Sequence, residues 1–127
     1  MKPFDGLSIL LLEDEYLIAL DAEQILKGLG VKNVEVVNTL AGAAKAAFEG
    51  HVNLAVLDVN INGEMSFPIA EKFHQQGTPV VFASGYEMRR HPVPQIANGV
   101  CLVKPYTGEM LKEALLAALS CPGNSPP

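Results

Sequence analysis

Polar residues whose side chains could take part in catalysis or metal binding end several short apolar runs of this sequence. They are Glu13 and Asp14 after ILLL, Asp58 after LAVL, Ser84 after VVFA and Lys104 after VCLV. Three carboxylates a few ångströms apart would repel by roughly 4 kcal/mol per close pair at an effective dielectric constant of about 20, so a counter-cation is needed. Oxygen ligands without histidine or cysteine favour Mg²⁺, which keeps coordination positions open for a phosphate.

The other residues of this set suit phosphoryl transfer. Asp58 could act as a carboxylate nucleophile, Lys104 as a point charge on phosphoryl oxygens, and Ser84 as a hydroxyl donor to the same group. Each residue taken alone has an ordinary explanation, because acids after a strand often cap the next helix and a single lysine is usually a solvated charge. Their convergence on one edge of a sheet is what favours a site.

Five short apolar runs predict the strands that would position these residues. The runs are nearly continuous, which is typical of strands buried on both faces of a parallel sheet. They cover Leu7-Leu12, Val34-Val37, Leu54-Leu57, Pro79-Ala83 and Val100-Val103. Because the carboxyl ends of parallel strands meet at one edge, the polar residues that end them should lie on one rim.

Apolar residues at helical spacing predict helices between the strands. The expected buried faces are Ile18, Ala22, Ile25, Leu26 and Leu29; Leu40, Ala43, Ala44, Ala47 and Phe48; and Leu111, Ala114, Leu115, Ala118 and Leu119. The expected N-caps are Thr39, Ser66 and Thr107, and Gly30, Gly50 and Gly77 stand where helices should end. The last helix could bury its apolar face against the sheet or against a second copy, so a homodimer remains open.

Strands alternating with helices predict an α/β fold with a doubly wound, five-stranded parallel sheet between two layers of helices. The flavodoxin-like strand order 2-1-3-4-5 fits, and it places a binding site at the switch between strands 1 and 3. Pro92 and Pro94 forbid a long regular helix between Gly85 and Gly99, so the fourth helix should be short, displaced or absent. We expect one domain over residues 1–120 and a frayed tail over residues 121–127.

Composition and charge exclude several classes of partner. The 127 residues carry 14 acids and 9 bases, for a net charge of -5, which disfavours nucleic acid. No apolar run is long enough to span a bilayer. Cys101 and Cys121 show neither metal-ligand spacing nor a disulfide framework, so a reducing cytoplasm is the expected location.

The segments LLLEDE, LAVLDVN, VVFASGY and CLVKPY closely resemble, in order and over essentially the whole chain, the receiver domains of two-component response regulators. The resemblance implies that Asp58 accepts a phosphoryl group from a histidine kinase or a histidine phosphotransfer protein. It also implies a Mg²⁺ site of Glu13, Asp14, Asp58 and the backbone carbonyl of Asn60, with Asp14 nearer the metal. Ser84 would hydrogen-bond a phosphoryl oxygen and Lys104 would pair with it.

Further positions carry expectations from the same resemblance. Pro105 matches the place of a cis Lys-Pro bond, and Asn60 and Tyr86 match positions that tune how fast the phosphoryl group is lost. Cys101 stands where the family usually has its switch aromatic, and we expect this thiol to be a small core filler. Tyr86 resembles a subgroup with a Phe-Ala-Thr-Gly loop motif, so we expect phosphorylation to reorder the loop from Ser84 to Gly99. Glu15 has no implied role and should face solvent.

The leading interpretation is therefore a stand-alone, single-domain receiver that catalyses only its own phosphorylation and dephosphorylation and acts by docking on a downstream target protein. A phosphorylation-independent interaction module with the same fold is the main alternative. A haloacid-type hydrolase would want an acid two residues after its nucleophile, where Asn60 stands. Flavin binding is disfavoured because no Thr- or Gly-rich loop follows the first strand.

Overall fold

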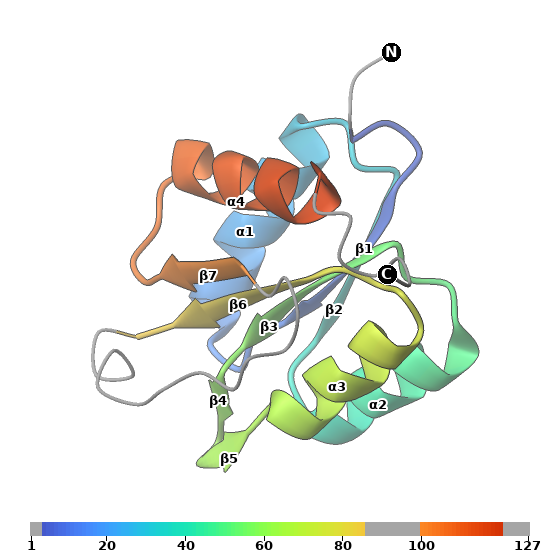
Figure 1. Ribbon diagram of the computed structural model, residues 1–127. Helices are drawn as coiled ribbons and strands as arrows, with labels where there is room; N and C mark the ends of the chain where they lie inside the picture. Colours follow the sequence, from blue (N-terminus) through green and yellow to red (C-terminus); the bar gives the residue numbers. More distant parts are fainter. Residues whose placement is uncertain (1–3, 86–99, 121–127) are drawn as a thin grey trace.

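The computed structural model describes residues 4–85 and 100–120, and within them a five-stranded parallel sheet forms the centre of the molecule (Figure 1). Its strands are β1 (Ser8–Leu12), β2 (Asn33–Val37), β3 (Leu54–Asp58), β6 (Val80–Ser84) and β7 (Val100–Val103). The order across the sheet is β2-β1-β3-β6-β7. This order confirms the predicted flavodoxin-like arrangement, and β3 lies at the centre.

Two of the strands extend one residue further than their apolar runs. Asp58 is the last residue of β3 and pairs with Ala83, and Ser84 is the last residue of β6 and pairs with Val103. All five residues of β3 and of β6 are buried. The polar residues that end these strands are therefore held by the hydrogen-bond ladder of the sheet itself.

Within the described residues, two helices cover each face of the sheet (Figure 1). Helices α1 (Tyr16–Gly28) and α4 (Gly108–Ser120) lie on one face, and α2 (Leu40–Glu49) and α3 (Phe67–Gln75) lie on the other. Side chains of β1 alternate between two cores, with Ile9 and Leu11 in the core under α1 and α4, and Leu10 and Leu12 in the core under α2 and α3. The three-layer prediction is confirmed.

The last helix, α4, buries its predicted apolar face in this molecule. Leu111, Ala114, Leu115 and Ala118 are buried in the same core as Leu26 of α1. The sequence allowed the apolar face of α4 to pack either against the sheet or against a second copy of the chain. In the structure it packs against the sheet. None of the helices in the described ranges has the length and apolar character needed to cross a bilayer.

One predicted core position of α2 is wrong. Phe48 was expected on the buried face, but its side chain is 90% exposed, and Ala43, Ala46 and Ala47 form that face instead. The segment LAGAAKAAFE is apolar almost all round, so its periodicity does not select one face. The packing of α2 against β1 and α3 selects the face of small residues.

The predicted helix ends agree with the structure. Thr39 is the N-cap of α2 and its Oγ1 accepts a hydrogen bond from the Gly42 N–H at 3.0 Å. Thr107 Oγ1 accepts from the Met110 N–H at 3.1 Å in the first turn of α4. Gly50 is the C-cap of α2 with φ 76°, a left-handed conformation that favours glycine.

Ser66 is an N-cap of a different kind. It occupies the N-cap position of α3 as predicted, but its side chain makes no capping hydrogen bond. The residue is 0% exposed and its Oγ has no hydrogen-bond partner among the described residues. A buried hydroxyl without a partner costs free energy that an apolar side chain would not.

The structure also contains a hairpin that the sequence analysis did not predict. Strands β4 (Asn60–Ile61) and β5 (Glu64–Met65) pair antiparallel between β3 and α3. The connecting residues Asn62 and Gly63 both have positive φ, 52° and 89°, as a type I′ turn requires. The Asn-Gly dipeptide is the signal that could have revealed it. The predicted irregular fourth helix, Tyr86 and the tail 121–127 lie outside the described residues.

The two N-caps predict opposite responses to the loss of a hydroxyl. Thr39→Ala should lower the free energy of unfolding by about 1 kcal/mol because it removes a capping bond. Ser66→Ala should leave the free energy of unfolding unchanged or raise it, because it removes an unpaired buried oxygen. Urea unfolding of both variants measures this, and a cost for Ser66→Ala equal to that for Thr39→Ala would show that the Ser66 hydroxyl has a partner.

Candidate functional site

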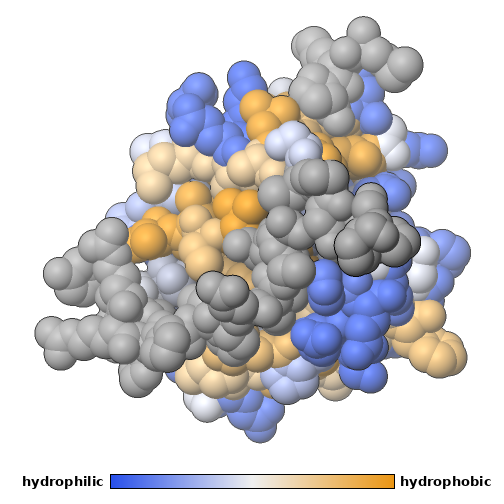
Figure 2. Space-filling model, viewed as in Figure 1, coloured by the Kyte–Doolittle hydropathy of each residue, from blue (hydrophilic) through white to orange (hydrophobic). Residues whose placement is uncertain are grey.

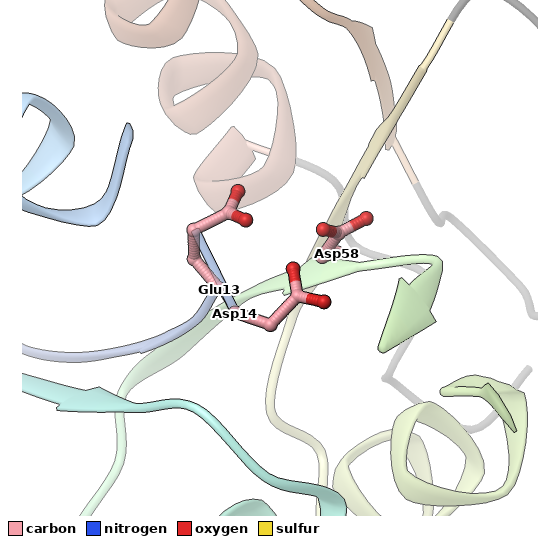
Figure 3. A group of neighbouring side chains, drawn as sticks. All are labelled: Glu13, Asp14 and Asp58. Carbon is pink, nitrogen blue, oxygen red and sulfur yellow. The ribbon is translucent and has the colours of Figure 1, made fainter. Parts of the chain in front are cut away.

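The predicted site residues meet at the carboxyl edge of the sheet. Glu13 and Asp14 follow β1, and Asp58 ends the neighbouring strand β3. Figure 3 shows the three side chains projecting from these two strand ends into the same space. Each offers one carboxylate oxygen, and the three oxygens lie within 4.8 Å of one another. The parallel register therefore produces the acidic cluster that the sequence predicted.

Lys104 contributes a positive charge to this cluster. Its Nζ donates hydrogen bonds to Asp58 Oδ2 at 2.8 Å and to Glu13 Oε1. The lysine follows β7, and its backbone N–H donates to the Ser84 carbonyl at 2.7 Å, which continues the ladder beyond the strand. The Lys104-Pro105 peptide bond is cis, as the resemblance implies.

Backbone N–H groups hold the carboxylates in addition to Lys104. The Glu15 N–H donates to Glu13 Oε2 at 3.0 Å, and the Asn60 N–H donates to Asp58 Oδ1 at 3.3 Å. The Asn62 N–H donates to Asp14 Oδ2 at 3.2 Å. Every carboxylate of the cluster therefore accepts at least one main-chain hydrogen bond, which fixes its orientation.

Burial and hydrogen bonding together shift the pKa values of Glu13 and Lys104. Loss of water raises the pKa of the Glu13 carboxyl above its ordinary value, and the hydrogen bonds from Lys104 and from the Glu15 N–H offset this only in part. Burial by itself would lower the pKa of the Lys104 ammonium, but the hydrogen bonds to Asp58 and Glu13 outweigh it, so the net pKa is raised. Lys104 is therefore a permanent cation at neutral pH.

The charges of the cluster fit a divalent cation. The ammonium of Lys104 pairs with Glu13 and Asp58, and Asp14 is the third carboxylate of the cluster. One cation against three carboxylates leaves an excess of negative charge where Glu13 is 3% and Asp58 is 7% exposed. All the ligand atoms of the cluster are carboxylate oxygens, the donor type of hard cations such as Mg²⁺. Glu13, Asp14 and Asp58 are thus the residues that could hold a metal ion.

Ser84 and Asn60 lie beside this cluster with different burial. Ser84 ends β6 next to the strand of Asp58 and is 8% exposed. Asn60 is exposed at the start of β4. The proximity of these two residues along the carboxyl edge agrees with their predicted roles, and those roles remain predictions. Glu15 is exposed before α1, as expected.

The expectation that Cys101 fills the core is wrong. Cys101 lies on the edge strand β7 opposite Phe82, and it is exposed. Figure 2 shows hydrophobic residues at the surface around β7, whereas hydrophilic residues dominate on the side of α2 and α3. An apolar run predicts a strand but not whether that strand lies at the edge of the sheet. Partial desolvation raises the pKa of the Cys101 thiol, so it is a poor candidate for a reactive thiolate.

Tyr106 is a residue near the site that the sequence analysis missed. Its ring is half-buried against the core under α1 and α4. Burial raises the pKa of the Tyr106 hydroxyl, and the negative charge of Glu13 raises it further. The signal was an aromatic residue directly after the Lys-Pro pair.

A parallel five-stranded sheet with an acidic cluster and a lysine at its carboxyl edge defines the class of receiver-like α/β proteins. No protein-family model matches the sequence, and no curated protein matches it. Among solved structures, SdrG from Sphingomonas melonis Fr1 is 37% identical, with 89% of this chain and 96% of that chain covered and a TM-score of 0.78. SdrG from Pseudomonas melonis Fr1, described in its BeF3-activated conformation, is 34% identical over 88% of this chain and 95% of that chain, with a TM-score of 0.69.

A response regulator receiver protein from Sinorhizobium medicae WSM419 is 25% identical, with 90% of this chain and 95% of that chain covered and a TM-score of 0.76. The fold, the sequence identity to SdrG and the coverage together place this protein in a family. The chain belongs to the receiver domains of response regulators.

The excess negative charge of the cluster predicts that Glu13→Gln stabilises the protein when no divalent cation is present. The amide keeps an oxygen for Lys104 and loses the hydrogen bond from the Glu15 N–H. It also removes a buried charge whose desolvation cost is larger than the stabilisation by these partners. In EDTA at neutral pH, thermal and urea unfolding should show a gain of about 1 kcal/mol for Glu13→Gln. The exposed neighbouring substitution Glu15→Gln is the matched control and should leave the stability unchanged.

The pH dependence of the free energy of unfolding tests the same prediction in a second way. A carboxyl whose pKa is raised in the native state binds its proton more tightly there than in the unfolded chain. Its contribution to stability is present below the ordinary value of 4.5 and is lost as the pH rises through the raised pKa. The advantage of Glu13→Gln in EDTA should therefore grow as the pH rises over this window, and a constant difference would contradict the assignment.

Proposed function

We propose that this receiver accepts a phosphoryl group on Asp58 from a histidine kinase or a histidine phosphotransfer protein in a Mg²⁺-dependent reaction, and that the phosphorylated form acts by binding a target protein in the cytoplasm. The observation that carries the proposal is the contact of Asp58 with Lys104 at 2.8 Å inside the acidic cluster. The description of SdrG in a BeF3-activated conformation supports it, since that relative is 34% identical.

The described residues supply the groups for an in-line transfer. Asp58 would attack the phosphorus of a phosphohistidine, so that an O–P bond forms while the P–N bond breaks. The imidazole nitrogen leaves with the electron pair of that bond and takes up a proton. Lys104 already donates a hydrogen bond to Asp58 Oδ2 and so orients the carboxylate before transfer. After transfer it would pair with one phosphoryl oxygen, and the Ser84 hydroxyl would donate to another phosphoryl oxygen.

The acidic cluster would bind the metal ion that this transfer requires. Glu13, Asp14 and Asp58, together with the Asn60 carbonyl, would hold Mg²⁺, which when bound neutralises charge on the phosphoryl oxygens. The group that is modified is a residue of the protein itself, so the protein is a signalling module that catalyses only its own phosphorylation and dephosphorylation.

The exposed face of α1 is where a protein donor would dock. Tyr16 and Leu17, directly after the acidic pair, are 76% and 75% exposed, and Leu20 one turn later is 38% exposed. These large apolar side chains lie on the helix that begins beside the site. A donor histidine must reach Asp58 from solvent, so an apolar contact surface next to the acids suits a protein partner.

Phosphorylation itself is tested by intact-mass spectrometry after incubation with a small acyl-phosphate donor. We expect a single phosphoryl adduct with Mg²⁺ and none in EDTA, because the transferred charge needs a counter-cation. Asp58→Asn should abolish the adduct while the circular dichroism spectrum stays native. No adduct on the wild-type protein, together with no binding of beryllofluoride, would instead support the phosphorylation-independent interaction module.

The docking face predicts a change that depends on the donor. Leu17→Gln should slow phosphotransfer from a phosphorylated histidine kinase or phosphotransfer protein by about tenfold, because it removes an apolar anchor of the complex. It should leave phosphorylation by the small acyl-phosphate donor unchanged, because the site is intact. Phe48→Gln is the matched control, since Phe48 is 90% exposed on α2, which lies on the other face of the sheet. Equal effects of the two substitutions would contradict docking on α1.

A further inference from the structure

The β4–β5 hairpin connects the phosphoacceptor strand to α3 and is a built element. Its strands pair Asn60 with Met65 and Ile61 with Glu64. The Gly63 N–H donates to Asn60 Oδ1 at 2.8 Å and closes the turn from within. The positive φ of Gly63, 89°, is a conformation that residues with a side chain rarely adopt.

The base of the hairpin is anchored in the core. Val59 and Ile61 are 0% and 2% exposed and belong to the core under α2 and α3. The Val59 N–H donates to the Ala83 carbonyl at 2.9 Å, and the Ser66 N–H donates to the Val59 carbonyl at 2.8 Å. The two-residue turn therefore projects from a fixed base.

The tip of this hairpin reaches the acidic cluster. The Asn62 N–H donates to Asp14 Oδ2 at 3.2 Å, a contact between residues 48 positions apart in the sequence. Asp14 follows β1 and lies outside any helix or strand. Among the described residues, no other hydrogen bond to the Asp14 side chain is present, whereas Glu13 and Asp58 are each held by Lys104 and by a main-chain N–H.

We propose that the β4–β5 hairpin is a positioning element of the cation site, and that the Asn62 N–H holds the Asp14 carboxylate within the acidic cluster so that the affinity for Mg²⁺ depends on the Asn62-Gly63 turn. The inference rests on the proposed function in taking Glu13, Asp14 and Asp58 as Mg²⁺ ligands. A carboxylate has about four lone-pair sites on two oxygens, so a hydrogen bond at Oδ2 leaves capacity for a cation. Groups that orient a metal ligand commonly control metal affinity.

Substitutions at Gly63 test the turn directly. Gly63→Val should strain the turn and weaken Mg²⁺ binding by about 10-fold. The matched control is Gly77→Val, because Gly77 has φ 80° and both glycines have open space where a Cβ would be placed. It strains the backbone equally at a site that is not part of the hairpin, and it should leave the Mg²⁺ affinity unchanged. The readout is the dissociation constant from a Mg²⁺ titration followed by amide shifts, with no phosphoryl donor present.

Two further variants separate positioning from general destabilisation. Gly63→Asn should keep a Mg²⁺ affinity close to that of the wild-type protein, because asparagine tolerates the left-handed conformation. Gly63→Ala adds milder strain and replaces Gly63→Val if the latter does not fold, with Gly77→Ala as its control. Wild-type affinity in every Gly63 variant, or an equal loss in the Gly77 controls, would overturn the inference. A wild-type protein that binds no Mg²⁺ would overturn the cation site of the proposed function, and this inference with it.

Discussion

Repulsion among the carboxylates of Glu13, Asp14 and Asp58 is the constraint on which the functional edge of this structure depends. Three acids whose oxygens lie within 4.8 Å of one another would separate if their backbones could move. They cannot, because β1 and β3 are neighbouring strands of a parallel sheet whose side chains are buried on both faces. The two hydrophobic cores therefore provide the free energy that keeps like charges together.

Lys104 reduces the repulsion among the three carboxylates but does not neutralise the cluster. It follows β7, which lies two strands away from β3, and it donates hydrogen bonds to both Glu13 and Asp58. One ammonium between carboxylates leaves a site that is stable enough to fold and is still attractive to a further cation. Burial raises the pKa of Glu13 in spite of these bonds, which shows that desolvation is the larger effect there. Unfavourable electrostatic interactions of this kind are common at functional sites, which often lower the stability of the folded protein.

Local features that deviate from the sequence predictions have identifiable physical causes. Phe48 is exposed because α2 is apolar almost all round, so its periodicity could not distinguish the face that packs. Cys101 is exposed because β7 is an edge strand, and the composition of a strand does not reveal its position in the sheet. The hairpin between Asp58 and α3 was missed although its Asn-Gly turn was present in the sequence, because strands of two residues lack a detectable alternation.

The sequence by itself determined the strands, the three layers and the identity of the acids, the serine and the lysine at the carboxyl edge, and it was compatible with the flavodoxin-like strand order that the structure has. It could do so because apolar strands and helical periodicity are local properties, and because parallel strands bring their carboxyl ends to one edge whatever the details of packing. Only the tertiary structure decided which partner each group takes: Lys104 with Glu13 and Asp58, and the Asn62 N–H with Asp14. These choices depend on distances between residues far apart in the chain, which no local pattern specifies.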